Sequence, residues 1–128
     1  MPAIYTVPNV FQGRMYTVTI TTHVRHRRPV EMIGAEAPSV MRTDLTIRYQ
    51  PVDGLAELLS LDSYLESFVP VELTAEEAVL RIVHDFQEMV KPEWVEIIGS
   101  CIFLTGRMEL SVKAYGKQPN EVHKGDPK

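Results

Sequence analysis

Two helical segments lie between two pairs of alternating segments in this chain, and that order restricts its fold more than any other feature. Residues 15–25 and 45–49 alternate apolar and polar side chains and are rich in β-branched residues. Residues 94–103 and 108–115 have the same character and predict a hairpin, in which Met108, Leu110, Val112 and Ala114 point inward. The order therefore predicts an α+β fold, a ββααββ antiparallel sheet with two helices on one face.

The two helices are predicted from apolar spacing and from residues typical of helix ends. Apolar residues recur at helical spacing over residues 55–68, and Pro70 ends that segment. Thr74 and Glu77 have the spacing of a capping box at the start of the second helix, and Pro92 marks its end.

The length of 128 residues suits one domain, which we place at residues 15–115, between an irregular arm (1–14) and a flexible polar tail (116–128). The net charge of −4 gives no general attraction to nucleic acid or anionic membranes, so neither is an expected partner. The single cysteine, Cys101, excludes an internal disulfide and favours a cytoplasmic setting. Its position on an apolar strand face favours a core role over a nucleophilic one.

Residues 57–68, ELLSLDSYLESF, carry a resemblance to a known family. The 7-cyano-7-deazaguanine (preQ0) reductases read ESKSLK at this place, followed by a tail like LYL-x-SF. The chain keeps Glu57, Ser60 and the Tyr64–Phe68 tail, and further landmarks follow in the same order between Met41 and Tyr115. The chain thus resembles the tunnelling-fold (T-fold) superfamily and, within it, the QueF and QueF-like reductases.

This resemblance implies subunits that oligomerise into a barrel, with sites at subunit interfaces. The implied ligand is a small heterocycle of the purine, 7-deazapurine or pterin type. Glu76 matches the glutamate that anchors the ring, and Ala75 stands where the family has histidine. Glu57 matches a second glutamate beside the substrate, and the neighbouring family serine is Leu58 here.

Several family residues are replaced. The nucleophilic cysteine position is Gly34 and the proton-moving aspartate position is Met41, although a short loop shift would bring Asp44 near the latter. Without a thiol at this position no thioimide can form there. Leu59 and Asp62 stand at the positions of the family's two cofactor-binding lysines. We therefore predict no cofactor and consider NADPH unsuited to this chain.

Each candidate residue also has a structural interpretation. Glu76 can stabilise the helix dipole, and Glu57 can be an exposed acid at a helix start. His23 and His26 are candidates for general acid–base catalysis, because imidazole titrates near neutrality. Their spacing of three places them on opposite faces of a strand, so we predict no metal site. The basic residues in 25–28 can be a solvated strand end or can hold an anion.

Three functions follow from these residues. The first is an enzyme that binds the ring between subunits and acts by non-covalent acid–base chemistry instead of NADPH-dependent nitrile reduction. The alternative is a non-catalytic ligand-binding protein or partner subunit that kept the T-fold pocket. A structural oligomer without a ligand is the third.

Overall fold

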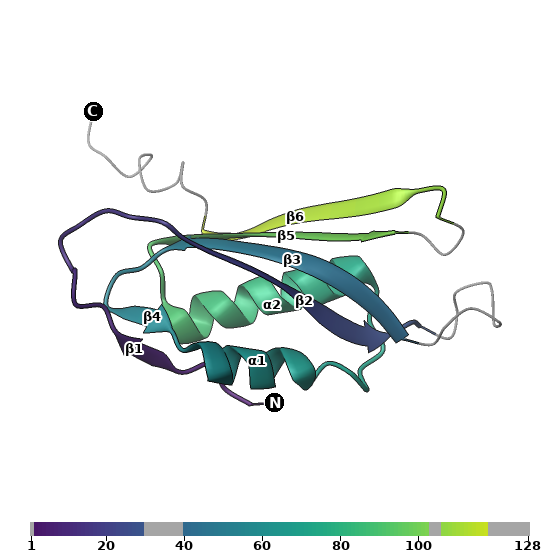
Figure 1. The fold of residues 1–128 in the computed structure, drawn as a ribbon, viewed down its shortest axis with the longest axis horizontal. Coiled ribbons are helices and arrows are strands. Elements are labelled where there is room, and N and C mark those ends of the chain that lie inside the picture. The colour runs from purple at the N-terminus through teal and green to yellow at the C-terminus, as the bar shows by residue number, and fades with distance from the viewer. Residues whose placement is uncertain (1, 30–39, 103–105, 118–128) are drawn as a thin grey trace.

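The computed structural model describes residues 2–29, 40–102 and 106–117, which form an α+β fold (Figure 1). Helices α1 (Leu58–Glu66) and α2 (Ala75–Val90) cover one face of a four-stranded antiparallel sheet with the order β2-β3-β5-β6. Its strands are β2 (Val18–Arg27), β3 (Val40–Gln50), β5 (Trp94–Ile102) and β6 (Glu109–Lys117). The predicted ββααββ order and the placement of both helices on one face are confirmed.

Residues 1–14, expected to be an irregular arm, contribute a strand and part of the core. Strand β1 (Thr6–Pro8) pairs antiparallel with β4 (Gly54–Ala56) in a separate two-stranded sheet. Ile4 is 3% exposed and packs in the main core. The buried Asn9 side chain donates to the Val52 carbonyl at 2.9 Å. The expectation was wrong because a three-residue strand has too little alternation to be recognised in a sequence.

Helix α1 begins later than its apolar spacing predicted. Residues 54–56 belong to β4, so the predicted 55–68 helix is shortened to Leu58–Glu66. Tyr49 holds this strand in place, because its hydroxyl accepts a hydrogen bond from the Ala56 N–H at 3.0 Å. The second helix begins as predicted at Thr74 and ends at Lys91, which has a positive φ of 55°.

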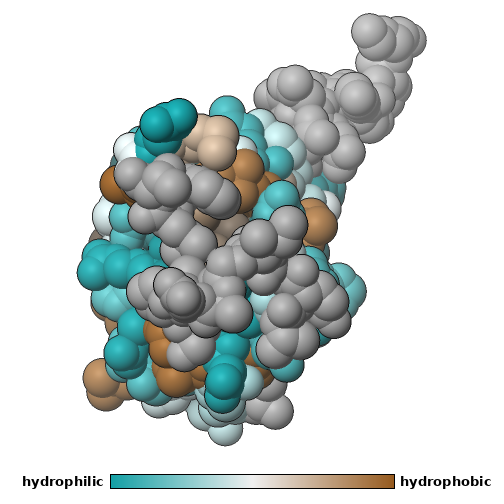
Figure 2. Space-filling view, turned by 90° about the vertical axis from the view of Figure 1, so that its right-hand side faces the viewer, coloured by the Kyte–Doolittle hydropathy of each residue, from teal (hydrophilic) through white to brown (hydrophobic). Residues whose placement is uncertain are grey.

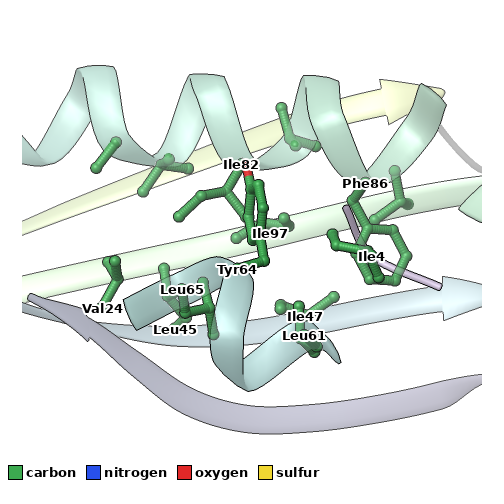
Figure 3. Close-up of a cluster of buried hydrophobic side chains, with 14 of the residues drawn as sticks. Ile4, Val24, Leu45, Ile47, Leu61, Tyr64, Leu65, Ile82, Phe86 and Ile97 are labelled. Atoms are coloured by element: carbon green, nitrogen blue, oxygen red, sulfur yellow. The ribbon is translucent and has the colours of Figure 1, made fainter. Parts of the chain in front are cut away.

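The core lies between the two helices and the sheet (Figure 3). Alternate strand residues point toward the helices, because successive side chains of a strand lie on opposite faces. The Tyr49 and Phe86 rings meet edge to face, with centroids 4.9 Å apart. The fully buried side chains include Tyr49, Tyr64, Phe68, Phe86, Leu45, Ile47, Ile82, Ile97, Val24, Val79 and Val95.

Strand β6 is covered over only part of its apolar face. Met108, Leu110, Val112 and Ala114 were predicted to point inward. Ala114 is buried and Val112 packs against the core, whereas Met108 is 56% and Leu110 is 39% exposed. Met108 and Leu110 do face the helical side, but they line a pocket between this end of β6 and α2 and are therefore not buried. Of the predicted polar tail, residues 116–117 extend β6, and 118–128 lie outside the described residues.

Candidate functional site

Glu76 lies in the first turn of α2, at a well-capped helix start. The Thr74 side chain accepts a hydrogen bond from the Glu77 N–H at 3.1 Å, and the Glu77 side chain accepts one from the Thr74 N–H at 3.0 Å. This reciprocal pair is the predicted capping box. Because Glu77 makes the cap, the neighbouring Glu76 carboxylate is not used to cap the helix.

Gly99 brings the start of α2 close to the sheet. A Cβ atom at this position would lie 2.3 Å from the Val79 Cγ2 atom of α2 and 3.1 Å from the Thr43 Cγ2 atom of β3. Only glycine permits this contact. Glu76 is three residues before Val79 and therefore lies on the same side of α2, one turn closer to its start. This position brings Glu76 near Cys101, two residues after Gly99 on β5.

A pocket of about 380 Å³ lies between the start of α2 and the ends of three strands. The helix contributes Thr74, Ala75 and Glu76. Figure 2 faces this end of the molecule and shows hydrophobic surface among hydrophilic side chains. The remaining lining residues are Arg28, Met41, Cys101, Ile102, Met108, Glu109 and Leu110. Apolar walls with a few charged groups suit a flat, weakly polar ring.

Cys101 lies in the wall of this pocket and is partly buried. The expectation of a core cysteine is corrected, because the pocket replaces the core at this end of β5. Burial, and secondarily the nearby Glu76 charge, raises the pKa of the Cys101 thiol. A thiol that stays protonated is a weak nucleophile, so its surroundings do not activate it.

Glu57 and Leu58 lie at the other end of the helical layer from Glu76 (Figure 1). The Glu57 N–H donates a hydrogen bond to the Tyr5 carbonyl beside β1. In the same region, the sulfur of Met89, in the last turn of α2, accepts a hydrogen bond from the Ile4 N–H. Helix α2 has 16 residues and is therefore about 24 Å long. One subunit does not bring Glu57 to the pocket of Glu76.

Glu57 caps α1. Its two carboxylate oxygens accept hydrogen bonds from the Leu59 and Ser60 N–H groups, each at 2.8 Å. These bonds lower the pKa of the Glu57 carboxyl. The next side chain, Leu58, is 62% exposed and points away from the core. The predicted substrate contacts of Glu57 and Leu58 stay predictions, and within one chain these residues do not reach the pocket of Glu76.

His26 is fully buried and outside the pocket. Its Nδ1 lies 2.8 Å from the Leu73 carbonyl oxygen, and its Nε2 lies 2.9 Å from Thr43 Oγ1. A carbonyl can only accept, so Nδ1 carries the proton and Nε2 accepts from the Thr43 hydroxyl. Burial lowers the pKa of His26, which favours this neutral form. The ring thereby joins the segment before α2 to β3.

His23 pairs with Asp44 across β2 and β3 and lies on the face opposite to Val24 and His26. That face of the sheet carries neither α1 nor α2. His23 is therefore separated from the Glu76 pocket of its own chain by the sheet. A catalytic role for either histidine stays a prediction.

The basic residues of the 25–28 segment have different surroundings. Arg25 forms an exposed ion pair with Glu66 at 3.0 Å, as expected for a solvated strand end. Arg28 lies in the wall of the pocket instead. Among the described residues that line the pocket, Arg28 is thus the cation beside the two carboxylates of Glu76 and Glu109.

The sequence did not identify most of the pocket wall. Met41 was noted only as a replaced family residue, whereas Ile102, Glu109 and Leu110 were assigned to ordinary strands. Gly34, at the position of the nucleophilic cysteine, lies outside the described residues.

None of the helices in the described part of the chain is long and apolar enough to cross a membrane. Within residues 2–29, 40–102 and 106–117, no three His, Cys, Asp or Glu side chains are grouped so that they could hold a metal ion.

Proteins described as NADPH-dependent 7-cyano-7-deazaguanine reductases are among those similar to this chain. An NADPH-dependent 7-cyano-7-deazaguanine reductase of Thermoanaerobacter pseudethanolicus is 47% identical over 55 residues, covering 43% of this chain and 41% of the relative. A protein of the same description from Anaeromyxobacter sp. (strain Fw109-5) is 34% identical over 79 residues, covering 61% of this chain and 64% of the relative. The chain thus matches less than two thirds of the length of these relatives.

The fold is also that of a solved structure. The crystal structure of the archaeosine synthase QueF-Like in the apo form superimposes with a TM-score of 0.68 at 18% identity, covering 80% of this chain and 96% of the other. This likeness agrees with the tunnelling fold that the sequence predicted. The model of the QueF-like protein family matches residues 43–119. Since that match spans more than half of the chain, the protein belongs to the QueF-like family.

Proposed function

We propose that this protein binds a purine, 7-deazapurine or pterin-type ring in the pocket at the start of α2. The observation that carries this proposal is the position of Glu76, which was expected to anchor the ring and lines an apolar pocket of about 380 Å³. Its carboxylate accepts hydrogen bonds from ring N–H groups, which an ionised carboxylate does better than a neutral acceptor. The apolar walls contact the faces of the ring.

The complete site requires more than one subunit. Glu57 lies near the C-terminal end of α2, and Glu76 lies at the N-terminal end, about one helix length away. If both glutamates contact one ligand, they come from different chains. A homo-oligomer with interfacial sites satisfies this condition, and it also covers exposed apolar residues such as Met108 and Ile102.

The chemistry we propose is non-covalent acid–base catalysis, such as ring opening, hydration, cyclisation or tautomerisation. Glu76 and Glu109 line the pocket and can orient a water that moves the proton. Both His26 nitrogens are occupied by Leu73 and Thr43. His23 could serve such a site only from a neighbouring subunit, because it lies on the helix-free face.

Reduction by NADPH is not part of the proposal. Met41, at the position of the proton-moving aspartate, lines the pocket and has no titratable group. The exposed Leu59 stands at the position of a lysine that contacts the cofactor, and a leucine cannot bind a phosphate. These replacements favour a function without a thioimide or a hydride donor.

The alternative is a non-catalytic ligand-binding protein or partner subunit. Two observations favour it: Met41 contributes no proton donor, and the Cys101 thiol has a raised pKa. Under this alternative the ligand binds at Glu76 without being converted.

Ligand-dependent thermal stabilisation tests the proposal. Purines, 7-deazapurines and pterins are added separately to the wild type, to Glu76→Gln and to Glu88→Gln. The last variant is a matched control, because Glu88 is an exposed glutamate near the other end of the same helix. A ligand at 100 times its dissociation constant stabilises the folded state by about 2.7 kcal/mol.

We expect one ring class to raise the melting temperature of the wild type and of Glu88→Gln but not of Glu76→Gln. The ligand is then incubated with the protein, and product formation separates the enzyme from the binding protein. If no ring class raises the melting temperature of the wild type, ring binding at Glu76 is wrong.

A further inference from the structure

The four-stranded sheet divides at the end where the pocket lies. Pairing between β3 and β5 stops at Asp44 and Ser100. On the outer sides, β3 remains paired with β2 as far as Val40, and β5 remains paired with β6 as far as Ile102. Figure 1 shows the same separation, with β3 curving away from β5 and β6 at this end. Within the described strands, this leaves a fork between β3 and β5.

A second pocket, of about 370 Å³, lies at the same fork. It shares four lining residues with the first pocket: Met41, Cys101, Ile102 and Glu109. The first pocket also touches α2, whereas the second is lined by strand residues alone. The two pockets therefore meet at the fork, one on the helical side and one on the helix-free side.

The second pocket is more polar than the first. Asp44 and Met41 are three residues apart on β3, so their side chains lie on opposite faces of the sheet. Asp44 therefore lies in the second pocket and does not replace the lost aspartate in the first. Arg42 Nε lies 2.9 Å from Asp44 Oδ1, and Ser100 is paired with Asp44 at the base of the fork.

The charges of the second pocket select the kind of group that it can hold. Among the described residues that line it, the carboxylates are Asp44 and Glu109, and the cation, Arg42, is already paired with Asp44. Two carboxylates with one shared cation repel a phosphate group. The same carboxylates accept hydrogen bonds from neutral hydroxyl groups, and Ser100 can both donate and accept. The second pocket thus suits an uncharged substituent with several hydroxyls.

We propose that the ligand is a nucleoside, whose ring lies beside Glu76 and whose sugar passes through the fork into the second pocket. This inference rests on the proposed function, because it assumes that the ring binds at Glu76. It adds that the sugar contributes to binding and that a 5′-phosphate does not. Asp44 is the residue that recognises the sugar hydroxyls.

Calorimetric titration with three matched probes tests this inference: 7-deazaguanine, its ribonucleoside and the 5′-monophosphate of that nucleoside. We expect the nucleoside to bind the wild type at least tenfold more tightly than the base, and the monophosphate to bind more weakly than the nucleoside. Asp44→Asn should weaken nucleoside binding about tenfold and leave base binding unchanged. Thr46→Ala is the matched control, because Thr46 is on the same face of β3 but does not line the pocket.

Ser100→Ala is a second variant and should act in the same direction as Asp44→Asn. The inference is overturned if the base binds as tightly as the nucleoside, or if Asp44→Asn weakens both equally. In those cases the ring site at Glu76 stands and only the sugar site is wrong. If none of the three probes binds the wild type, the proposed function and the inference fail together.

Discussion

His26 predicts how the stability of this protein depends on pH. Its imidazole is fully buried, with Nδ1 donating to the Leu73 carbonyl and Nε2 accepting from Thr43. Burial lowers its pKa below the 6.5 of an unfolded chain. When the pH falls below 6.5, the imidazole of the unfolded chain therefore takes up a proton, whereas that of folded His26 stays neutral until its lower pKa is reached. The contribution of His26 is complete above pH 6.5 and is lost as the pH falls toward the folded pKa.

The size of this effect follows from the linkage between protonation and folding. The largest possible loss, for an imidazole that takes up no proton in the folded state, is about 1.4 kcal/mol of unfolding free energy between pH 7.5 and pH 5.5. Urea denaturation at a series of pH values and one protein concentration measures this loss. His26→Gln removes the titrating ring and keeps a donor and an acceptor, so this pH dependence should disappear.

His84→Gln is the control, because His84 is an exposed histidine on α2. This variant should keep the pH dependence of the wild type. An unchanged slope in His26→Gln, or a slope lost in His84→Gln, would refute the assignment of His26 as a buried neutral histidine. The Glu57 and Glu77 carboxyls, whose pKa values are lowered from 4.5, contribute only at more acid pH.

Three further predictions concern stability, measured by chemical denaturation. Gly99→Ala should destabilise the protein by about 1–3 kcal/mol, because the new Cβ would lie 2.3 Å from Val79 Cγ2; no change would refute the close approach of α2. Thr74→Ala should cost about 1 kcal/mol through the lost helix cap, and a neutral result would contradict the capping box. Tyr64→Phe should destabilise the protein by about 1–2 kcal/mol, because the Tyr64 hydroxyl donates a hydrogen bond to Asp85 at 2.5 Å. An unchanged free energy of unfolding in Tyr64→Phe would contradict the contribution of this hydrogen bond.

The elements of the fold could be predicted because their signals are local. Alternation over residues 15–25 and 108–115 located two strands, and Thr74 with Glu77 located the start of α2. Each signal depends only on residues within a few positions of one another. The pairing of β1 with β4 joins residues about 50 positions apart and left no such signal.

The candidate site could be predicted only in part. Glu76 and Ala75 were named from the family resemblance, and the structure places both in the pocket. Glu57 was named on the same basis, but it lies at the far end of the helices and caps α1. A linear sequence does not show that the two glutamates are separated by the length of α2.

The sequence by itself determined the order of the two helices and of the four strands of the main sheet, the ends of α2 and the apolar stripes that form the core, because these depend on local conformational preference and side-chain periodicity. Only the tertiary structure decided which residues share a cavity. Gly99 allows α2 to approach β5, and the early end of the β3–β5 pairing opens the fork next to Cys101. His26 became a buried hydrogen-bonding residue through contacts with Leu73 and Thr43, which are distant in the chain. These outcomes depend on packing between segments, which no local pattern specifies.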